Sequence, residues 1–312
     1  VLETGEIDSS TTFCSRYFSG DFNLKMVKDI YSGASSGAPN YLTAVGNTLY
    51  FRAEDGTNGR ELWKSDGTAS GTVMVKDIYS GINSGYPDHL TAVGNTLYFA
   101  ATDGINGYEL WKSDGTASGT VMVKDIRSGS SDGYPAYLTA IGNTLYFRAN
   151  DGTNGNELWK SDGTASGTVM VKNIRSGSGS SYPGYLTAVG NTLYFSANDG
   201  TNGVELWKSD GTASGTVMVK DISSGSGSSV SSELTAVGNT LYFQAYDTTN
   251  GYELWKSDGT ASGTVMVKDI YSGISGGSPY ELTAFGNTLF FQAQDGTNGI
   301  ELWKSDGTAS GT

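Results

Sequence analysis

The sequence predicts an all-β protein, a six-bladed β-propeller with four antiparallel strands per blade. Six tryptophans recur 48 residues apart, at Trp63, Trp111, Trp159, Trp207, Trp255 and Trp303. Each 48-residue unit contains four short apolar runs separated by glycine-rich turns. No segment keeps the apolar spacing of an amphipathic helix over three turns. Four-stranded units of this length, repeated roughly four to eight times, are typical of propellers.

The chain divides into an irregular N-terminal segment, 1–24, and a single propeller domain, 25–312. The units follow without insertion, at 25–72, 73–120, 121–168, 169–216, 217–264 and 265–312. A small sheet with apolar side chains on both faces cannot bury them alone, so neighbouring units must stack. An open β-solenoid is the alternative, but it lacks this regular set of hairpin-type turns.

In the first blade we expect strands at 41–45, 48–53, 61–64 and 72–78. Gly46-Asn47 is a turn signal between the first two. The glycine-rich loops 55–59 and 66–71 separate the remaining strands, and a glycine- and serine-rich connection, 79–86, leads to the next unit.

The repeat begins at its fourth strand, 25–30, and ends after its third, 301–304. We therefore expect segment 25–30 to pair with the last third strand and close the ring, because closure satisfies two exposed edges. The alternative is that this segment completes a neighbouring molecule's blade and builds a filament. Closure within the chain is favoured because a short connection is entropically cheaper than association.

The formal net charge of −13 disfavours nucleic acid and anionic membrane surfaces as partners. Divalent cations and neutral glycans suit this charge better. The longest apolar runs are far shorter than the roughly 20 residues that span a bilayer, so no membrane insertion is expected. The single cysteine, Cys14, excludes an internal disulfide framework and a cysteine-based zinc site.

The segment Glu61–Thr72, which reads ELWKSDGTASGT, recurs in all six units. It resembles the bacterial ELWxxDGTxxGT repeat family. The resemblance covers nearly everything after residue 24. It implies a secreted or surface-exposed bacterial protein with a β-propeller-like array, and therefore an extracellular or cell-surface location. It supplies no catalytic residues.

Variation between units is concentrated on one loop face, formed by the second–third loops and the connections between blades. Tyrosine, asparagine and arginine on such a face are typical of recognition surfaces. The candidate ligand-binding residues are Tyr86, Tyr134, Tyr182, Tyr41, Tyr137, Tyr185, Arg60, Tyr108, Asn156 and Tyr252. The alternative is drift in exposed loops that tolerate change.

The second–third loops also suggest a metal site. Each opens with an aspartate, and an asparagine such as Asn58 follows three residues later. Carboxylate and amide oxygens are ligands that suit calcium. The candidates are Asp55, Asp103, Asp151, Asp199, Asp247 and Asp295. The alternative is that Asp-Gly and Asn-Gly only build tight turns. No other cofactor is expected.

Two sets of repeated residues are expected to be structural. Each tryptophan sits beside a leucine in mid-strand and should pack between blades. The Glu61 and Lys64 series should satisfy each other or neighbouring backbone, because unpaired buried charges are costly.

No enzymatic activity is expected. The sole histidine, His89, occurs in one unit without a nucleophile motif, and carboxylates repeat equally in every blade. The sequence instead predicts a secreted or surface module for multivalent, lectin-like binding and adhesion, with glycans or other surface ligands as partners. The alternative is a structural subunit that self-associates into polymers through its N-terminal strand or ring faces.

Overall fold

The computed structural model describes residues 25–312, apart from the side chain of Ser231. This part of the chain contains 23 strands and no helix, which confirms the all-β prediction. None of its segments is therefore a helix that could cross a membrane. The predicted irregular segment 1–24, with Cys14, lies outside the described residues.

The strands form six separate antiparallel sheets, which are the predicted blades. The first contains β1 (Asn40–Val45), β2 (Thr48–Glu54), β3 (Arg60–Ser65) and β4 (Val73–Lys76), hydrogen-bonded in that order. The next four repeat this order with β5 (Asp88–Val93), β6 (Thr96–Thr102), β7 (Tyr108–Ser113), β8 (Val121–Lys124), β9 (Ala136–Ile141), β10 (Thr144–Asn150), β11 (Asn156–Ser161), β12 (Val169–Lys172), β13 (Gly184–Val189), β14 (Thr192–Asn198), β15 (Val204–Ser209), β16 (Val217–Lys220), β17 (Val230–Val237), β18 (Thr240–Asp247), β19 (Gly251–Ser257) and β20 (Val265–Lys268). The sixth has three strands, β21 (Tyr280–Phe285), β22 (Thr288–Gln294) and β23 (Ile300–Ser305).

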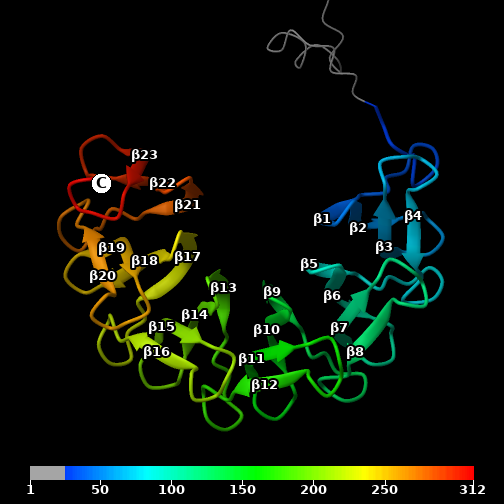
Figure 1. The fold of residues 1–312 in the computed structure, drawn as a ribbon, viewed down its shortest axis with the longest axis horizontal. Helices are drawn as coiled ribbons and strands as arrows, with labels where there is room; N and C mark the ends of the chain where they lie inside the picture. The colour runs from blue at the N-terminus through cyan, green and yellow to red at the C-terminus, as the bar shows by residue number, and fades with distance from the viewer. Residues whose placement is uncertain (1–24) are drawn as a thin grey trace, which may run out of the picture.

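The blades stand side by side around a central space (Figure 1). The first strand of each blade lies nearest this space, and the fourth strand lies at the outer edge. First strands of successive blades contact each other. A repeated hydrogen bond joins them: the Thr43 hydroxyl donates to the Leu90 carbonyl at 3.3 Å, and the series continues to Thr235 and the Leu282 carbonyl at 3.0 Å. The inner strands therefore form a continuous lining.

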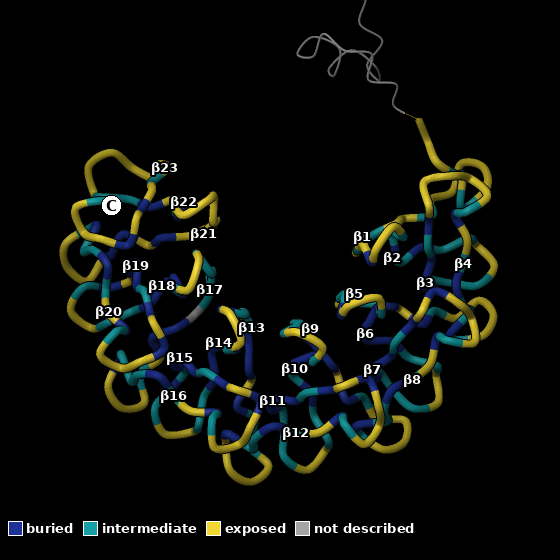
Figure 2. Tube along the Cα trace, viewed as in Figure 1, coloured by how far each residue is buried: buried dark blue, intermediate teal, exposed yellow. Residues whose placement is uncertain are grey.

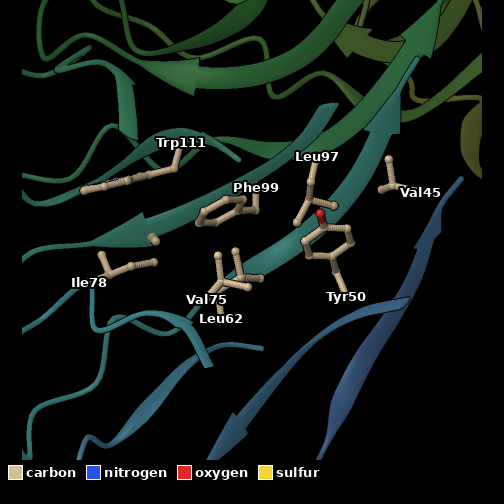
Figure 3. Close-up of a cluster of buried hydrophobic side chains, with 9 residues drawn as sticks. Val45, Tyr50, Leu62, Val75, Ile78, Leu97, Phe99 and Trp111 are labelled. Atoms are coloured by element: carbon tan, nitrogen blue, oxygen red, sulfur yellow. The ribbon is translucent and has the colours of Figure 1, made fainter. Parts of the chain in front are cut away.

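Large apolar side chains fill the space between neighbouring sheets. Val45, Tyr50 and Leu62 of the first blade pack with Phe99 and Trp111 of the second (Figure 3). Buried residues lie within the sheets while the turns at their ends are exposed (Figure 2). The structure confirms packing between blades for five of the six tryptophans, Trp111, Trp159, Trp207, Trp255 and Trp303, and aromatic burial of this kind contributes strongly to stability. Trp63 instead packs on the first blade with Phe51, Ala53 and Ile30.

The repeated glutamate and lysine each bind backbone, one of the two outcomes predicted. Glu61 is fully buried and accepts hydrogen bonds from the Ile78 and Gly85 amides, at 3.0 and 2.6 Å. The Lys64 ammonium donates to the Gly115 carbonyl of the next blade at 2.9 Å. The glutamate thus holds the connection between blades, and the lysine ties one blade to its neighbour.

The predicted ring closure is wrong for this structure, because the last sheet has only three strands and segment 25–30 forms none. The six blades form an open arc whose two ends lie on opposite sides of a gap (Figure 1). Segment 25–30 instead stays on the first blade, where the Lys28 ammonium donates to the Thr72 carbonyl at 2.7 Å. Lys76 makes the same bond to Thr120, also at 2.7 Å. The segment therefore keeps a fourth strand's contacts with the following blade and lacks a preceding blade.

The last blade is exposed on the face that points away from the fifth blade. Leu302 is 77% exposed, whereas its equivalent Leu62 is fully buried. Ile300 and Phe285 are exposed as well. In each of the first five blades, the following blade covers this face. In the sixth blade the same apolar face is exposed at the end of the arc.

Candidate functional site

The candidate site begins with a bulge that every inner strand contains. In β1, Asn40 pairs with Arg52 and Thr43 with Tyr50, so Tyr41 and Leu42 together oppose one residue of β2. The five other inner strands show the same shift. The first bulge residue is left-handed in each blade, with φ between 53° and 66°, and we call this set the inner row: Tyr41, His89, Tyr137, Tyr185, Glu233 and Glu281.

These six non-glycine residues adopt a backbone conformation that costs on the order of 1–3 kcal/mol each. Bulges re-aim side chains and are common beside binding sites. Five of the six are tyrosine or glutamate, which are not usual choices for a left-handed turn. The strain therefore marks the inner row as a place where side-chain direction matters.

Three rings of the inner row, His89, Tyr137 and Tyr185, lie next to one another on successive blades. The ring centroids of His89 and Tyr137 are 6.5 Å apart, and those of Tyr137 and Tyr185 are 6.1 Å apart. At the far end, the Glu233 carboxylate accepts a hydrogen bond from the Leu282 amide at 3.0 Å. The row thus runs from aromatic to acidic across successive blades.

Two arginines of the second strands lie over the rings of two inner-row tyrosines. The Arg52 guanidinium lies 4.6 Å from the Tyr41 ring centroid, and that of Arg148 lies 4.8 Å from the Tyr137 centroid. Cation–π contacts of this kind attract the cation to the ring face and help to orient the ring.

The predicted residues of the connections and third strands contact one another. Tyr86, Tyr134 and Tyr182 share a φ of 48° and are largely exposed. The Tyr134 ring lies 6.2 Å from that of Tyr108, whose hydroxyl donates to the Tyr86 carbonyl. The structure therefore brings together residues from two separate positions of the repeat, one in the connection and one in the third strand.

Two further predicted residues differ in their surroundings. Arg60 forms an ion pair with Glu54, with 3.0 Å between Nε and Oε2, and its guanidinium lies 5.9 Å from the Tyr86 centroid. Tyr252 instead pairs with Tyr246 of its own blade, with centroids 5.1 Å apart. Tyr252 lies in the fifth blade, outside the cavities described next.

A cavity of about 640 Å³ opens between the second and third blades. Its lining includes Asp88, His89, Tyr108, Asp132, Tyr134, Arg148, Asn156 and Tyr182. A shallower hollow of about 430 Å³ follows the inner strands β9, β13 and β17, past Tyr137, Tyr185 and Glu233. Of the predicted loop-face residues, Tyr108, Tyr134, Asn156 and Tyr182 line the cavity, and Tyr137 and Tyr185 line the hollow. Tyr41, Tyr86, Arg60 and Tyr252 line neither.

Local electrostatics keep the tyrosines of this region as neutral hydrogen-bonding groups. Burial raises the pKa of Tyr108, and the nearby charge of Asp88 raises it further. A hydrogen bond to Asp132 raises the pKa of Tyr134. Burial also raises the pKa of Tyr185, with Tyr137 as the next contribution. At neutral pH these hydroxyls can donate as well as accept.

The aspartates predicted to bind calcium use their oxygens within the loop. Asp55 Oδ1 accepts from the Thr57 and Asn58 amides at 2.8 and 2.9 Å, and Asn58 Nδ2 donates to Oδ2 at 2.9 Å. The five other loops repeat this pattern. Partial burial acts to raise the pKa of Asp55, but these bonds hold it below its usual value. In residues 25–312 no three histidine, cysteine or acidic side chains gather as a metal group, and calcium stays a prediction.

Sequence reasoning did not select Asp88, Asp132 or Arg148, which supply the charges of the cavity. The signal was present in the comparison of units. Asp132 stands where the preceding unit has Ser84. At the second-strand position of Arg148, only the first unit also has an arginine, Arg52.

Comparisons with known proteins give a fold. No family model and no curated protein matches the chain. Prolyl oligopeptidase B from Galerina marginata, bound to a 35mer substrate, superposes with a TM-score of 0.52 at 11% identity, over 88% of this chain and 42% of that one. Oligopeptidase B from Leishmania major gives 0.51 at 13% identity, over 86% and 40%. The β-propeller domain of the Trilobed protease from Pyrococcus furiosus, described as having an open velcro topology, gives 0.47 at 11% identity, over 86% and 82%.

The chain has the fold of a β-propeller. It spans about half the length or less of several solved structures it resembles. These neighbours are peptidases, and at this identity the likeness shows the fold alone. The adhesion module expected from the sequence, with its polymer-forming alternative, is therefore not upheld, because the solved neighbours are peptidases. An enzymatic role for the whole protein, which the sequence argued against, is therefore a matter for proposal.

Proposed function

We propose that this chain is a propeller module that binds extended peptides along its inner row and serves a peptide-cleaving catalytic domain. The observation that carries the proposal is the inner row itself. It combines left-handed bulges, ordered aromatic rings and an acidic end on adjoining strands. Within residues 25–312 the outer strands carry no comparable row, and they repeat the sequence VMVK in every complete blade.

An extended peptide suits this surface chemically. Tyrosine rings contact aliphatic and aromatic side chains, while their hydroxyls bond to backbone amides of any sequence. Because the inner strands contact one another from blade to blade, a single extended chain can reach several members of the row. Glu233 and Glu281 at one end, together with the net charge of −13, favour peptides that carry lysine or arginine.

The solved neighbours agree with this role without assigning it. One of them was captured with a 35mer substrate, and the present chain covers 42% of its length. In the proposal, the propeller selects and orients the peptide, and a separate domain cleaves it. The inner row supplies the binding energy that positions the peptide for that reaction.

Fluorescence anisotropy with labelled peptides tests the proposal. A basic peptide of about a dozen residues should bind, and an acidic peptide of equal length should bind at least about tenfold more weakly. Tyr137→Ala should weaken binding about tenfold, because buried aromatic contacts dominate such interfaces. Tyr79→Ala, a matched change on the connection after the outermost strand β4, should leave affinity unchanged.

Equal affinity of the wild type and the Tyr137 variant would refute a role for the inner row. Binding of neutral oligosaccharides with no binding of either peptide would refute peptide recognition altogether.

A further inference from the structure

Two blades carry an arginine at the same strand position, and they differ in one contact. In the first blade, Arg52 Nε donates to Asn40 Oδ1 across the strand pair at 3.0 Å. In the third blade, Arg148 stands opposite Ala136. Arg148 Nε is buried and has no hydrogen-bond partner among the described residues.

This difference leaves a specific vacancy. Both arginines stack on the tyrosine of their own inner strand, at 4.6 and 4.8 Å, so their guanidinium groups are held alike. A buried donor without a partner costs free energy comparable to a lost hydrogen bond. In the third blade no side-chain oxygen takes the place of the Asn40 amide oxygen, so Arg148 Nε lacks the acceptor that Arg52 has.

The vacancy lies within the cavity between the second and third blades, because both Ala136 and Arg148 line it. Two carboxylates share the cavity and are partly engaged. Asp88 Oδ1 accepts from the His89 amide at 2.7 Å, and Asp132 Oδ1 accepts from the Tyr108 amide at 2.8 Å. Their negative charge disfavours a ligand group of charge −2, and Arg148 favours a group that carries one planar pair of oxygens.

We propose that this cavity binds a carboxylate, and that in the peptide it is the free C-terminus. The identification of the carboxylate as a peptide terminus rests on the proposed function. One carboxylate oxygen takes the position of the missing amide oxygen and accepts from Arg148 Nε. The remainder of the peptide then leaves the cavity along Tyr137 and the inner row. The propeller would thereby recognise one end of a peptide and set the direction in which the chain is held.

The structure itself suggests the variant that tests this. Ala136→Asn introduces the side chain that already occupies this place in the first blade, so it should fold and satisfy Arg148 internally. Ser232→Asn is the matched control, because it makes a similar change at the equivalent position of the fifth blade, opposite Gln244. Calorimetry would measure a basic peptide with a free C-terminus, the same peptide with a C-terminal amide, and acetate alone.

We expect the free acid to bind about tenfold or more tightly than the amide, the usual scale for a charge-assisted hydrogen bond. The Ala136 variant should bind acid and amide equally, and the Ser232 variant should behave like the wild type. Arg148→Lys should also lose the preference, since lysine lacks the Nε donor. Acetate competition against the acid would show that the pocket reads the carboxylate group itself.

Equal binding of acid and amide by the wild type would overturn the carboxylate site while leaving peptide binding intact. An undiminished preference in the Ala136 variant would place the carboxylate elsewhere and would also overturn it. Binding of acetate, with no binding of either peptide, would uphold the carboxylate site and defeat the proposed peptide function.

Discussion

A single glycine between neighbouring blades allows the packing to be tested quantitatively. Gly104 has φ of 77°, and a Cβ atom built there would lie 2.2 Å from Cζ of Tyr79. Gly81 has φ of 84° but open space around its Cβ position. Gly81→Ala should therefore measure the backbone cost alone, about 1 kcal/mol of unfolding free energy. Gly104→Ala should cost more, about 2–4 kcal/mol, because the tyrosine ring must also move.

The fifth blade indicates how this clash is relieved. There Thr248 replaces the loop glycine, and Ser223 replaces the large residue that covers it. Combining Tyr79→Ser with Gly104→Ala should therefore recover about 1–2 kcal/mol relative to the sum of the single changes. Urea unfolding of the wild type, both single variants and the double variant measures this coupling. Additivity within about 0.5 kcal/mol would refute the steric reasoning.

Three other predictions follow from the blade contacts. Burial raises the pKa of Glu61 from its ordinary 4.5 to about 7, so the unfolding free energy should fall as the pH rises from 4.5 to 7. A higher urea midpoint at pH 7.5 than at pH 5 would contradict this. Lys76→Met removes the 2.7 Å hydrogen bond to the Thr120 carbonyl and should lower the unfolding free energy by about 1–2 kcal/mol. The same change at exposed Lys304 should lower it by under about 0.5 kcal/mol, and equal losses in thermal unfolding would contradict the prediction. Spin labels at Lys25 and Lys304, with the native cysteine replaced, should report ends much farther apart than the roughly 5 Å between paired strands, and a closed ring would place them side by side.

The strands could be predicted because turn chemistry fixes them. The expected strand at 48–53 is observed at Thr48–Glu54, and that at 61–64 is observed at Arg60–Ser65. The fourth strand is shorter than expected, Val73–Lys76, because the Ile78 amide turns away to donate to buried Glu61. Ring closure could not be predicted, because it depends on the angle at which neighbouring sheets pack, and the periodicity does not contain that angle.

The site was predictable in its residues and less so in its geometry. Tyr41, Tyr137 and Tyr185 were selected from variation between units, but nothing in their types indicates a left-handed bulge. The missing partner of Arg148 is visible only by comparison with Arg52. Asn40 accepts from Arg52 Nε, and Ala136 at the equivalent position of the third blade has no acceptor for Arg148 Nε. Such a contact across strands becomes visible only once the register is known.

Hydrogen–deuterium exchange with a bound basic peptide tests the central claim, that ligands lie along the inner strands. Amides of β5, β9 and β13, at Asp88–Val93, Ala136–Ile141 and Gly184–Val189, should exchange more slowly when the peptide is present. Those of the outer strands, such as β8 at Val121–Lys124, should not change. Slowed exchange confined to the outer strands or to the exposed last blade would contradict the account.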